Sequence, residues 1–397
     1  MNYNFSDKLK NMQPSAIREI FKSLTDPSII AFAAGNPAPE SFPIDAIAKI
    51  SDNILKTDPV KALQYGITEG YPKLRELVAK RLDQKFGIGR PDDMTIIVSG
   101  GQQGIELTCK TLCNEGDTVL CENPSFIGSL NSFRSNGAVV KGIPMNDDGI
   151  DTALLEEALK NDPKVKLLYL IPTFQNPTGR TMSLKTRCEV YELAVRYGVV
   201  ILEDNPYGEL RFDGKELPTL KSMDTEGIVV YCGSFSKVLS SGMRIGFLCA
   251  NQQLMQKIVV AKQGEDVHTP MLPQMICADY IEQYDLDAHI KSIQDLYRHK
   301  CGVMLEALDK YMPDCVKYTR PEGGLFLWCT LPEGIELNEF VQAALKRKVA
   351  VVPGTAFNCD TAAGSDAFRV TYATPSEEQI TEGIKILGEL VTEFMKG

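Results

Sequence analysis

The segment KLLYLIPTFQNPTGRTMSLKTRCEVYELAVRYGVVILEDNPY (166–207) carries the pattern that decides the fold. Two apolar runs, 166–171 and 199–202, predict buried strands, and residues 184–197 between them have a helical pattern. Strands that are apolar along their whole length and joined through a helix are typical of a parallel sheet covered on both faces. The segment therefore predicts one strand–helix–strand unit of an α/β fold.

The same alternation continues on both sides of this unit. Further strands are predicted at 95–98, 118–121, 139–143, 228–232 and 245–249, with helical patterns between many of them, such as 103–113. Only twelve residues separate 232 from 245, which is short for a parallel crossover. We therefore expect an antiparallel pair at that point, within a mostly parallel, mixed sheet of seven strands covered by helices.

The pattern changes near residue 285. A long helix is predicted at 287–311, followed by strands at 325–330, 350–353 and 368–372, a helix near 336–346 and a last helix from 377. This is the order of a smaller α+β domain. The arm at 1–45 is rich in loop signals, so we expect it to pack against this domain or a partner subunit. We predict a large domain at 46–284 and a small domain built from 1–45 and 285–397.

Composition excludes several classes of protein. The chain has 397 residues and a formal net charge of −10, which argues against a general nucleic-acid or anionic-membrane binder. The N-terminus lacks the apolar core of a signal peptide, and no stretch approaches the ~20 apolar residues of a membrane span. Eleven cysteines form no C-x-x-C pair, and three histidines show no metal-ligand spacing. We predict a cytoplasmic protein without a metal site.

Polar residues follow the predicted strands where parallel strands of an open sheet bind ligands. They lie in S-G-G-Q-Q-G (99–104), P-T-F-Q-N-P-T-G (172–179), E-D-N-P-Y (203–207) and G-S-F-S-K (233–237), with Arg244 shortly after. Each alone could be an ordinary turn or solvated loop. The buried acidic pair at 203–204, however, needs a cationic partner. Together they supply the phosphate donors, carboxylate, phenol, amide and lysine that pyridoxal phosphate requires.

On these residues the chain resembles the fold type I, class I/II aminotransferases that use pyridoxal phosphate. The motifs are NPTG (176–179), the D-x-x-Y of Asp204 and Tyr207, S-x-S-K (234–237) followed by R-I-G (244–246), and Arg369. The segments SAIREI (15–20) and AAGNPAPESFP (33–43) resemble the 2-aminoadipate/kynurenine-type branch and the aminotransferase-like half of certain bacterial regulators.

The resemblance implies a role for each matching residue. Lys237 would be the Schiff-base lysine, Asp204 would pair with the ring nitrogen, and Tyr207 would hydrogen-bond the phenolic oxygen together with Asn176. The other implied cofactor contacts are stacking by Phe126 and phosphate binding by Gly101, Gln102, Gln103, Ser234, Ser236, Arg244 and, from the neighbouring subunit of a homodimer, Tyr65. The implied substrate contacts are Arg369 with the α-carboxylate, Asn176, Gly35 and, for a distal acid, Arg18.

These roles predict transamination between an L-amino acid and a 2-oxo acid, because a clamped carboxylate presents the Cα–H bond to Lys237. A β-lyase acting on sulfur amino acids would use the same residues. A ligand-sensing regulator body is a third interpretation, although such regulators carry a DNA-binding domain ahead of this fold. Ordinary alternatives exist for single residues: an ion pair for Arg369, packing for Tyr65 and Phe126, and a helix surface for Arg18. Ser241 stands where relatives often have proline.

Overall fold

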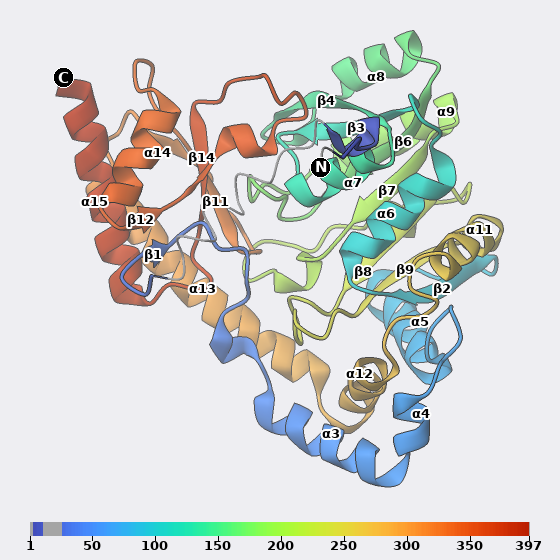
Figure 1. Cartoon of the computed structure of the whole chain (residues 1–397). Coiled ribbons are helices and arrows are strands. Elements are labelled where there is room, and N and C mark those ends of the chain that lie inside the picture. The colour runs from blue at the N-terminus through green and yellow to red at the C-terminus, as the bar shows by residue number, and fades with distance from the viewer. Residues whose placement is uncertain (1–2, 11–25, 397) are drawn as a thin grey trace.

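A computed structural model describes residues 3–10 and 26–396 of the chain. Its centre is an eight-stranded sheet (Figure 1). In spatial order the strands are β2 (Asp93–Val98), β9 (Gly246–Asn251), β8 (Val229–Ser234), β7 (Val200–Asp204), β6 (Val165–Leu170), β3 (Thr118–Asn123), β4 (Val139–Asn146) and β5 (Gly149–Ile150). The five strands from β8 to β4 run parallel, which confirms the predicted α/β class.

Of two expectations about the sheet, one is confirmed and one is wrong. The antiparallel pair expected after residue 232 is present, because β9 runs antiparallel to β8 and also to β2. The predicted number of seven strands was one too low. The additional strand β5 is two residues long and pairs antiparallel with β4 across a tight turn, with Gly149 at a φ of +114°. A two-residue strand has too few positions to show an apolar pattern, so the sequence did not reveal it.

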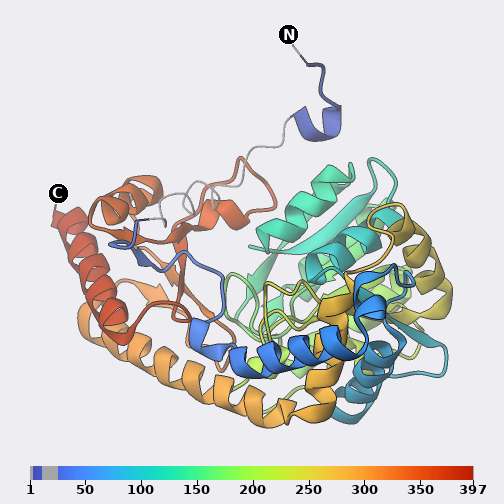
Figure 2. The ribbon, with the colours of Figure 1, turned by 60° about the horizontal axis from the view of Figure 1, so that its bottom comes forward.

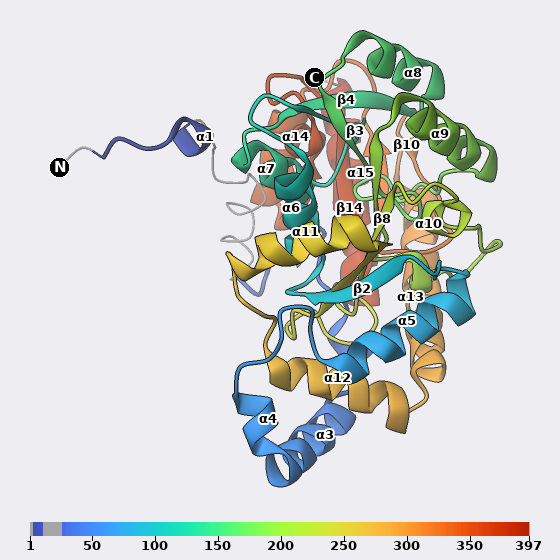
Figure 3. The same ribbon diagram turned by 90° about the vertical axis from the view of Figure 1, so that its right-hand side faces the viewer.

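Helices cover both faces of the sheet, as Figure 3 shows. One face carries α6 (Gly101–Leu112), α7 (Ile127–Ser135) and α11 (Gln252–Gln263), and the other α8 (Thr152–Asn161), α9 (Leu184–Tyr197) and α10 (Leu220–Met223). Successive strand residues serve the two sides: Leu167 packs in the core of the first layer, whereas Leu168 packs with the α8 and α9 side chains. Strands buried on both faces explain their continuous apolar runs.

Further helices border the β2 edge of this sheet. They are α3 (Ile44–Thr57), α4 (Pro59–Leu63), α5 (Pro72–Phe86) and α12 (Met271–Gln283). The helix α12 packs against α3, α4 and α5. The helix α13 (Leu286–Tyr311) then runs from this region to the second sheet, along the base of the molecule in Figure 2. It packs there against the last helix, α15 (Glu377–Lys396).

A second, antiparallel sheet has the order β10 (Lys317–Tyr318), β11 (Phe326–Thr330), β14 (Ala367–Thr371) and β13 (Val352–Pro353). The strand predicted at 350–353 is divided between β13 and β12 (Val349–Ala350), which follows α14 (Leu337–Lys346). Strand β1 (Ile30–Ala31) pairs with β12, so the arm from residue 26 onward contacts this part of the molecule. A short helix, α1 (Asp7–Lys10), lies further towards the N-terminus. The domain boundaries themselves stay a prediction.

Candidate active site

A cavity of about 350 Å³ lies at the carboxyl ends of β6, β7 and β8, where the second sheet approaches the large one. Twelve of the residues predicted from the sequence line it: Gly35, Gly101, Gln102, Phe126, Asn176, Asp204, Tyr207, Ser234, Ser236, Lys237, Arg244 and Arg369. They come from segments more than 300 residues apart along the chain. Their convergence follows from the parallel strands, whose carboxyl ends share one edge of the sheet.

One end of the cavity is built to hold an anion. Helix α6 begins at Gly101, so its first backbone N–H groups point towards this end and favour a negative charge. Gly100 has a φ of +80°, and a Cβ there would overlap with Nη2 of Arg244. The Ser234 hydroxyl accepts from the Ser236 backbone N–H at 3.0 Å, and both serines line the cavity. These donors suit a phosphate group.

Asp204 lies at the end of β7 and is 5% exposed. Its Oδ2 accepts a hydrogen bond from the Tyr169 hydroxyl at 2.7 Å. Burial raises the pKa of Asp204 to about 7, and the Tyr169 hydrogen bond opposes that rise. No cationic side chain pairs with this carboxyl group within residues 3–10 and 26–396. The cationic partner expected from the sequence is therefore not supplied by the described protein, and a protonated ring nitrogen in the cavity would supply it.

Lys237 follows β8 and lines the same cavity. Its Nζ donates to the backbone oxygen of Gly35 at 2.8 Å. Burial, together with the positive charges of Arg369 and Arg244, lowers the pKa of Lys237 to about 8. A lysine with a lowered pKa has a substantial neutral fraction near physiological pH, and the neutral amine is the nucleophilic form.

Arg369 lies on β14 and is buried. Its Nη1 donates to Asn176 Oδ1 at 2.9 Å and its Nη2 to the backbone oxygen of Ala33 at 3.0 Å. The guanidinium carbon lies 4.1 Å from the ring centroid of Phe326. Burial lowers the pKa of Arg369 to about 10, and its Nε has no hydrogen-bond partner. A buried cation with an unused donor suits a substrate carboxylate.

Asn176 connects two of these groups. Its Nδ2 donates to the Tyr207 hydroxyl at 3.4 Å while its Oδ1 accepts from Arg369. Burial raises the pKa of Tyr207, so the phenol keeps its proton at neutral pH. Phe126 precedes α7 and presents its ring to the cavity. The side chain of Gln102 already donates to Gly128 and Ser132 on α7, at 2.9 and 2.7 Å.

Two predicted residues do not line this cavity, and a third falls outside the described residues. Gln103 does not line the cavity: its Nε2 donates to Asp266 at 2.7 Å, and its Oε1 accepts from Lys262 and from the Ser99 backbone N–H. Its side chain therefore braces the turn before α6, and its predicted phosphate contact gains no support from this arrangement. Tyr65 is 82% exposed, as a residue that reaches a neighbouring subunit would be. Arg18 lies outside the described residues.

The sequence did not single out every residue at the cavity. Asn36, Ile105, Ile171, Pro206 and Phe326 also line it. Asn36, Ile171 and Pro206 adjoin predicted residues or a strand end, and Ile105 lies near the start of the predicted helix at 103–113. That proximity was a usable signal. Phe326 had no such signal, because only the second sheet brings it to the site. Among the described residues no group of acidic, histidine or cysteine side chains could hold a metal ion.

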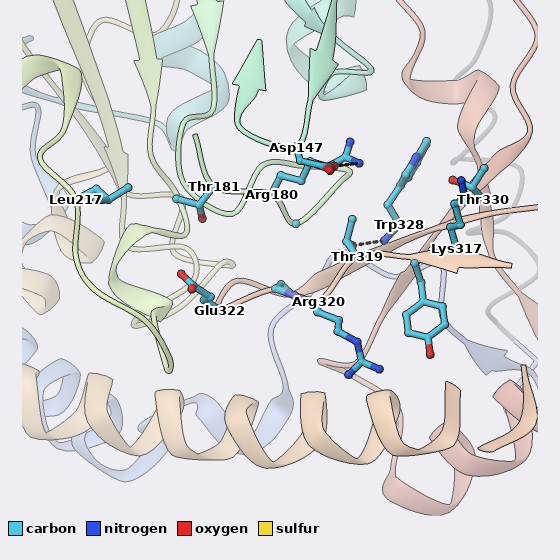
Figure 4. A pocket seen from close by; sticks show the side chains of 13 residues that line it. Asp147, Arg180, Thr181, Leu217, Lys317, Thr319, Arg320, Glu322, Trp328 and Thr330 are labelled. Carbon is cyan, nitrogen blue, oxygen red and sulfur yellow. Dashed lines mark hydrogen bonds and ion pairs between the residues drawn. The ribbon is translucent and has the colours of Figure 1, made fainter. Parts of the chain in front are cut away.

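A larger cavity of about 590 Å³ is lined by residues 179–181, at the end of the NPTG motif, and by residues 317–322 (Figure 4). It contains cationic side chains, but Arg180 pairs with Asp147 at 2.9 Å and Arg320 pairs with Asp309. Its acidic residue Glu322 pairs with Arg211. The remaining cation, Lys317, is exposed to solvent and needs no partner. The smaller cavity, with Lys237 and the buried Arg369 both lacking a counter-ion, is therefore the candidate site.

The residues fit pyridoxal phosphate, and the fold places them as a fold type I enzyme requires. The family model "Aminotransferase class I and II" matches residues 27–387. The chain belongs to this family. It is therefore an enzyme that transfers an amino group between an amino acid and a 2-oxo acid with pyridoxal phosphate as cofactor, as the sequence predicted.

Relatives in the 2-aminoadipate/kynurenine-type branch confirm the predicted resemblance. The aromatic-amino-acid aminotransferase 1 of Thermococcus litoralis is 41% identical, over 99% of this chain and 95% of its own length. The 2-aminoadipate transaminase of Thermus thermophilus is 40% identical, over 95% and 94%. The solved structure of Pyrococcus horikoshii kynurenine aminotransferase, in complex with PMP, matches with a TM-score of 0.95 at 39% identity, covering 99% of this chain and 98% of that one.

Proposed function

We propose that Lys237, Asp204 and Arg369 carry the transamination. The supporting observation is that a partly buried lysine, a buried carboxyl group and a buried arginine, none paired with an opposite charge in the described residues, line one cavity. Pyridoxal phosphate, when bound, supplies an aldehyde that condenses with amines and a ring that accepts the electrons of a broken Cα bond. The residues around it decide which bond breaks.

Each residue has a proposed part. Lys237 holds the cofactor and then moves the Cα proton, which its lowered pKa allows. Arg369 holds the α-carboxylate, so that deprotonation is favoured over loss of CO₂. Asp204 keeps the ring nitrogen protonated. Asn176 and Tyr207 bind the phenolic oxygen, and the phosphate lies against Gly101, the backbone at Gln102, Ser234, Ser236 and Arg244, with Phe126 on the ring and Gly35 near the substrate.

We also propose a homodimer with shared sites. Exposed apolar side chains gather around α4 and the loop after it: Val60 is 74% exposed, Leu63 73% and Ile67 50%. Tyr65 lies among them, with its ring against His268. An apolar group of this kind on the surface favours burial against another chain. The phosphate end of the partner's cavity is the destination that the sequence predicts for Tyr65.

Two further parts of the proposal concern the setting of the enzyme. All eleven cysteines lie in the described residues and carry free thiols, nine of them at least partly buried, which supports a reducing, cytoplasmic compartment. No helix among residues 3–10 and 26–396 is long and apolar enough to cross a membrane. We keep 46–284 and 1–45 with 285–397 as the two proposed domains.

For the substrate, we propose a donor with a long side chain, either aromatic or acidic, because the similar enzymes are named for aromatic amino acids, 2-aminoadipate and kynurenine. The test is a screen of L-amino acids against 2-oxoglutarate and pyruvate, with formation of the new 2-oxo acid as readout. We expect transfer from at least one donor of these classes. Release of pyruvate and ammonia from a cysteine conjugate without any acceptor would instead indicate a β-lyase.

A further inference from the structure

Tyr169 lies behind Asp204, outside the cavity itself. It belongs to β6, where it pairs with Leu202 of the neighbouring strand β7. Its hydroxyl makes the 2.7 Å bond to Oδ2 of Asp204, and the tyrosine is fully buried. The ring packs edge-on against Phe133, with centroids 5.3 Å apart. The position of the hydroxyl is thus determined by the core of the large sheet.

The direction of this hydrogen bond follows from the burial of the phenol. Burial raises the pKa of Tyr169 well above its ordinary value, and the negative charge of Asp204 raises it further. The phenol therefore keeps its proton and donates, and the carboxylate accepts. A neutral donor stabilises a carboxylate without cancelling its charge, unlike an arginine or a protonated histidine. In its ionised form Asp204 thus keeps a negative charge that a cationic ligand can pair with.

The bond also leaves one oxygen of Asp204 for the cavity. No residue within the described ranges donates to Oδ1, which lies 4.0 Å from the position a Cβ would take at Gly101. Besides Tyr169, the neighbouring titratable groups that Asp204 affects are Glu122, Tyr207 and Cys232. All three are acids, so none supplies a positive charge to Asp204. Tyr169 is accordingly the polar side chain on which the orientation of Asp204 depends.

We propose that Tyr169 is a positioning residue, which holds Asp204 ionised and directs its second oxygen to the ring nitrogen of the cofactor. This inference rests on the proposed role of Asp204. It predicts that the Tyr169 hydroxyl contributes to cofactor binding only through Asp204. A hydroxyl that merely supports the core would contribute equally whether or not residue 204 carries a charge.

A double-mutant cycle on the dissociation constant of pyridoxal phosphate separates these cases. We expect Tyr169→Phe to weaken binding about tenfold in the otherwise unchanged chain, and less than about twofold when Asp204→Asn is also present. Equal losses in both backgrounds would overturn the inference while leaving the proposed function intact. Unchanged binding by Asp204→Asn alone would contradict the role of Asp204 itself, which is a separate result.

The ¹⁵N resonance of ring-labelled pyridoxal phosphate gives a second readout. In Tyr169→Phe we expect it to move from the protonated towards the neutral position, because the carboxyl group becomes a stronger base. Tyr372→Phe is the matched control: this buried tyrosine donates to the Gly324 carbonyl and does not contact Asp204. The same movement in both variants, or none in Tyr169→Phe, would overturn the inference.

The cycle also covers a failure to fold. If Tyr169→Phe does not fold, the double variant with Asp204→Asn must fold, because it removes the carboxylate left without its donor. Loss of folding in both would mean that the hydroxyl serves the core and would overturn the inference. Folding of the double variant alone supports it.

Discussion

The surroundings of Arg369 leave its buried positive charge without a counter-ion from the described protein. Its guanidinium is enclosed by Phe326 and Phe357, at 4.1 and 5.1 Å, and Asn176 orients one of its nitrogens. A buried charge without a counter-ion is costly in free energy, so a fold keeps one where a ligand supplies the opposite charge. This is the basis for proposing that the arginine serves substrate binding rather than the stability of the second sheet.

From this we predict that Arg369→Gln lowers kcat/KM for amino acids on the order of a hundredfold, mostly through a higher KM. The physical reason is the loss of a charge-assisted pair to the α-carboxylate inside a buried cavity. Steady-state kinetics with the best donor measure it. Arg320→Gln, at the larger cavity, serves as the control and should leave both constants near those of the unchanged enzyme. A normal KM in Arg369→Gln would remove Arg369 from substrate binding.

At the residue scale the sequence predicted much of the cavity lining. Residues directly after a strand, such as Asp204 and Lys237, could be placed because the chain is short between the strand and the side chain. Gln103 could not be distinguished from Gln102, since both stand at the start of one helix. Successive side chains of a helix point in different directions, and the Gln103 side chain forms hydrogen bonds with Lys262 and Asp266.

At the scale of elements, the turn between β2 and α6 determines the phosphate end. Gly100 has a positive φ there, and Arg244 lies where a side chain would be. Gly116 provides a comparison within the same protein: its φ is +81°, yet no atom lies within 4 Å of a Cβ placed on it. The two glycines thus share a positive φ near 80° and differ in the side chain that a Cβ would meet.

We predict that Gly100→Ala and Gly116→Ala each destabilise the fold by about 1 kcal/mol through the strained backbone. Only Gly100→Ala should also displace Arg244 and weaken the binding of pyridoxal phosphate, by about tenfold or more. Urea unfolding and a cofactor titration measure the two effects. Equal cofactor affinity in both variants would show that Arg244 does not contact the phosphate.

Element types were well predicted where the apolar pattern was long. The strands of the parallel sheet and the helices α13 and α15 appear close to their expected bounds. The failures are short elements: β5 was not foreseen, and 350–353 is divided between two sheets. Two-residue strands depend on which neighbours the tertiary fold brings alongside, and a local pattern contains no such information.

For the whole molecule, the proposed dimer makes a direct prediction. Leu63→Glu places a charge within the exposed apolar group around Tyr65 and should convert the dimer into a monomer with strongly reduced activity. Sedimentation velocity and a transaminase assay measure the two outcomes. Leu184→Glu, an exposed apolar position on α9, is the control and should stay dimeric. A fully active monomeric Leu63→Glu would contradict shared sites.

Stability against pH is a second whole-molecule property. Burial raises the pKa of Glu122 from its ordinary value of 4.5 to about 8. Between these two pH values the folded protein keeps the Glu122 proton, whereas the unfolded chain has released it. The stabilising contribution of this proton is complete below pH 4.5 and is lost as the pH rises through about 8. Apoprotein should therefore become less stable across this range, by up to about 1.4 kcal/mol per pH unit. Glu122→Gln should flatten the dependence in urea titrations, and an unchanged slope would refute the assignment.

The most direct test of the proposed function is to identify the lysine that binds the cofactor covalently. The protein is incubated with pyridoxal phosphate, reduced with borohydride, digested and mapped by mass spectrometry. We predict a pyridoxyl phosphate group on Lys237, formed faster as the pH rises through about 8, because the neutral amine is the reacting form. Lys237→Ala should lose both this label and transaminase activity. Labelling of other lysines only, with full activity in Lys237→Ala, would contradict the account.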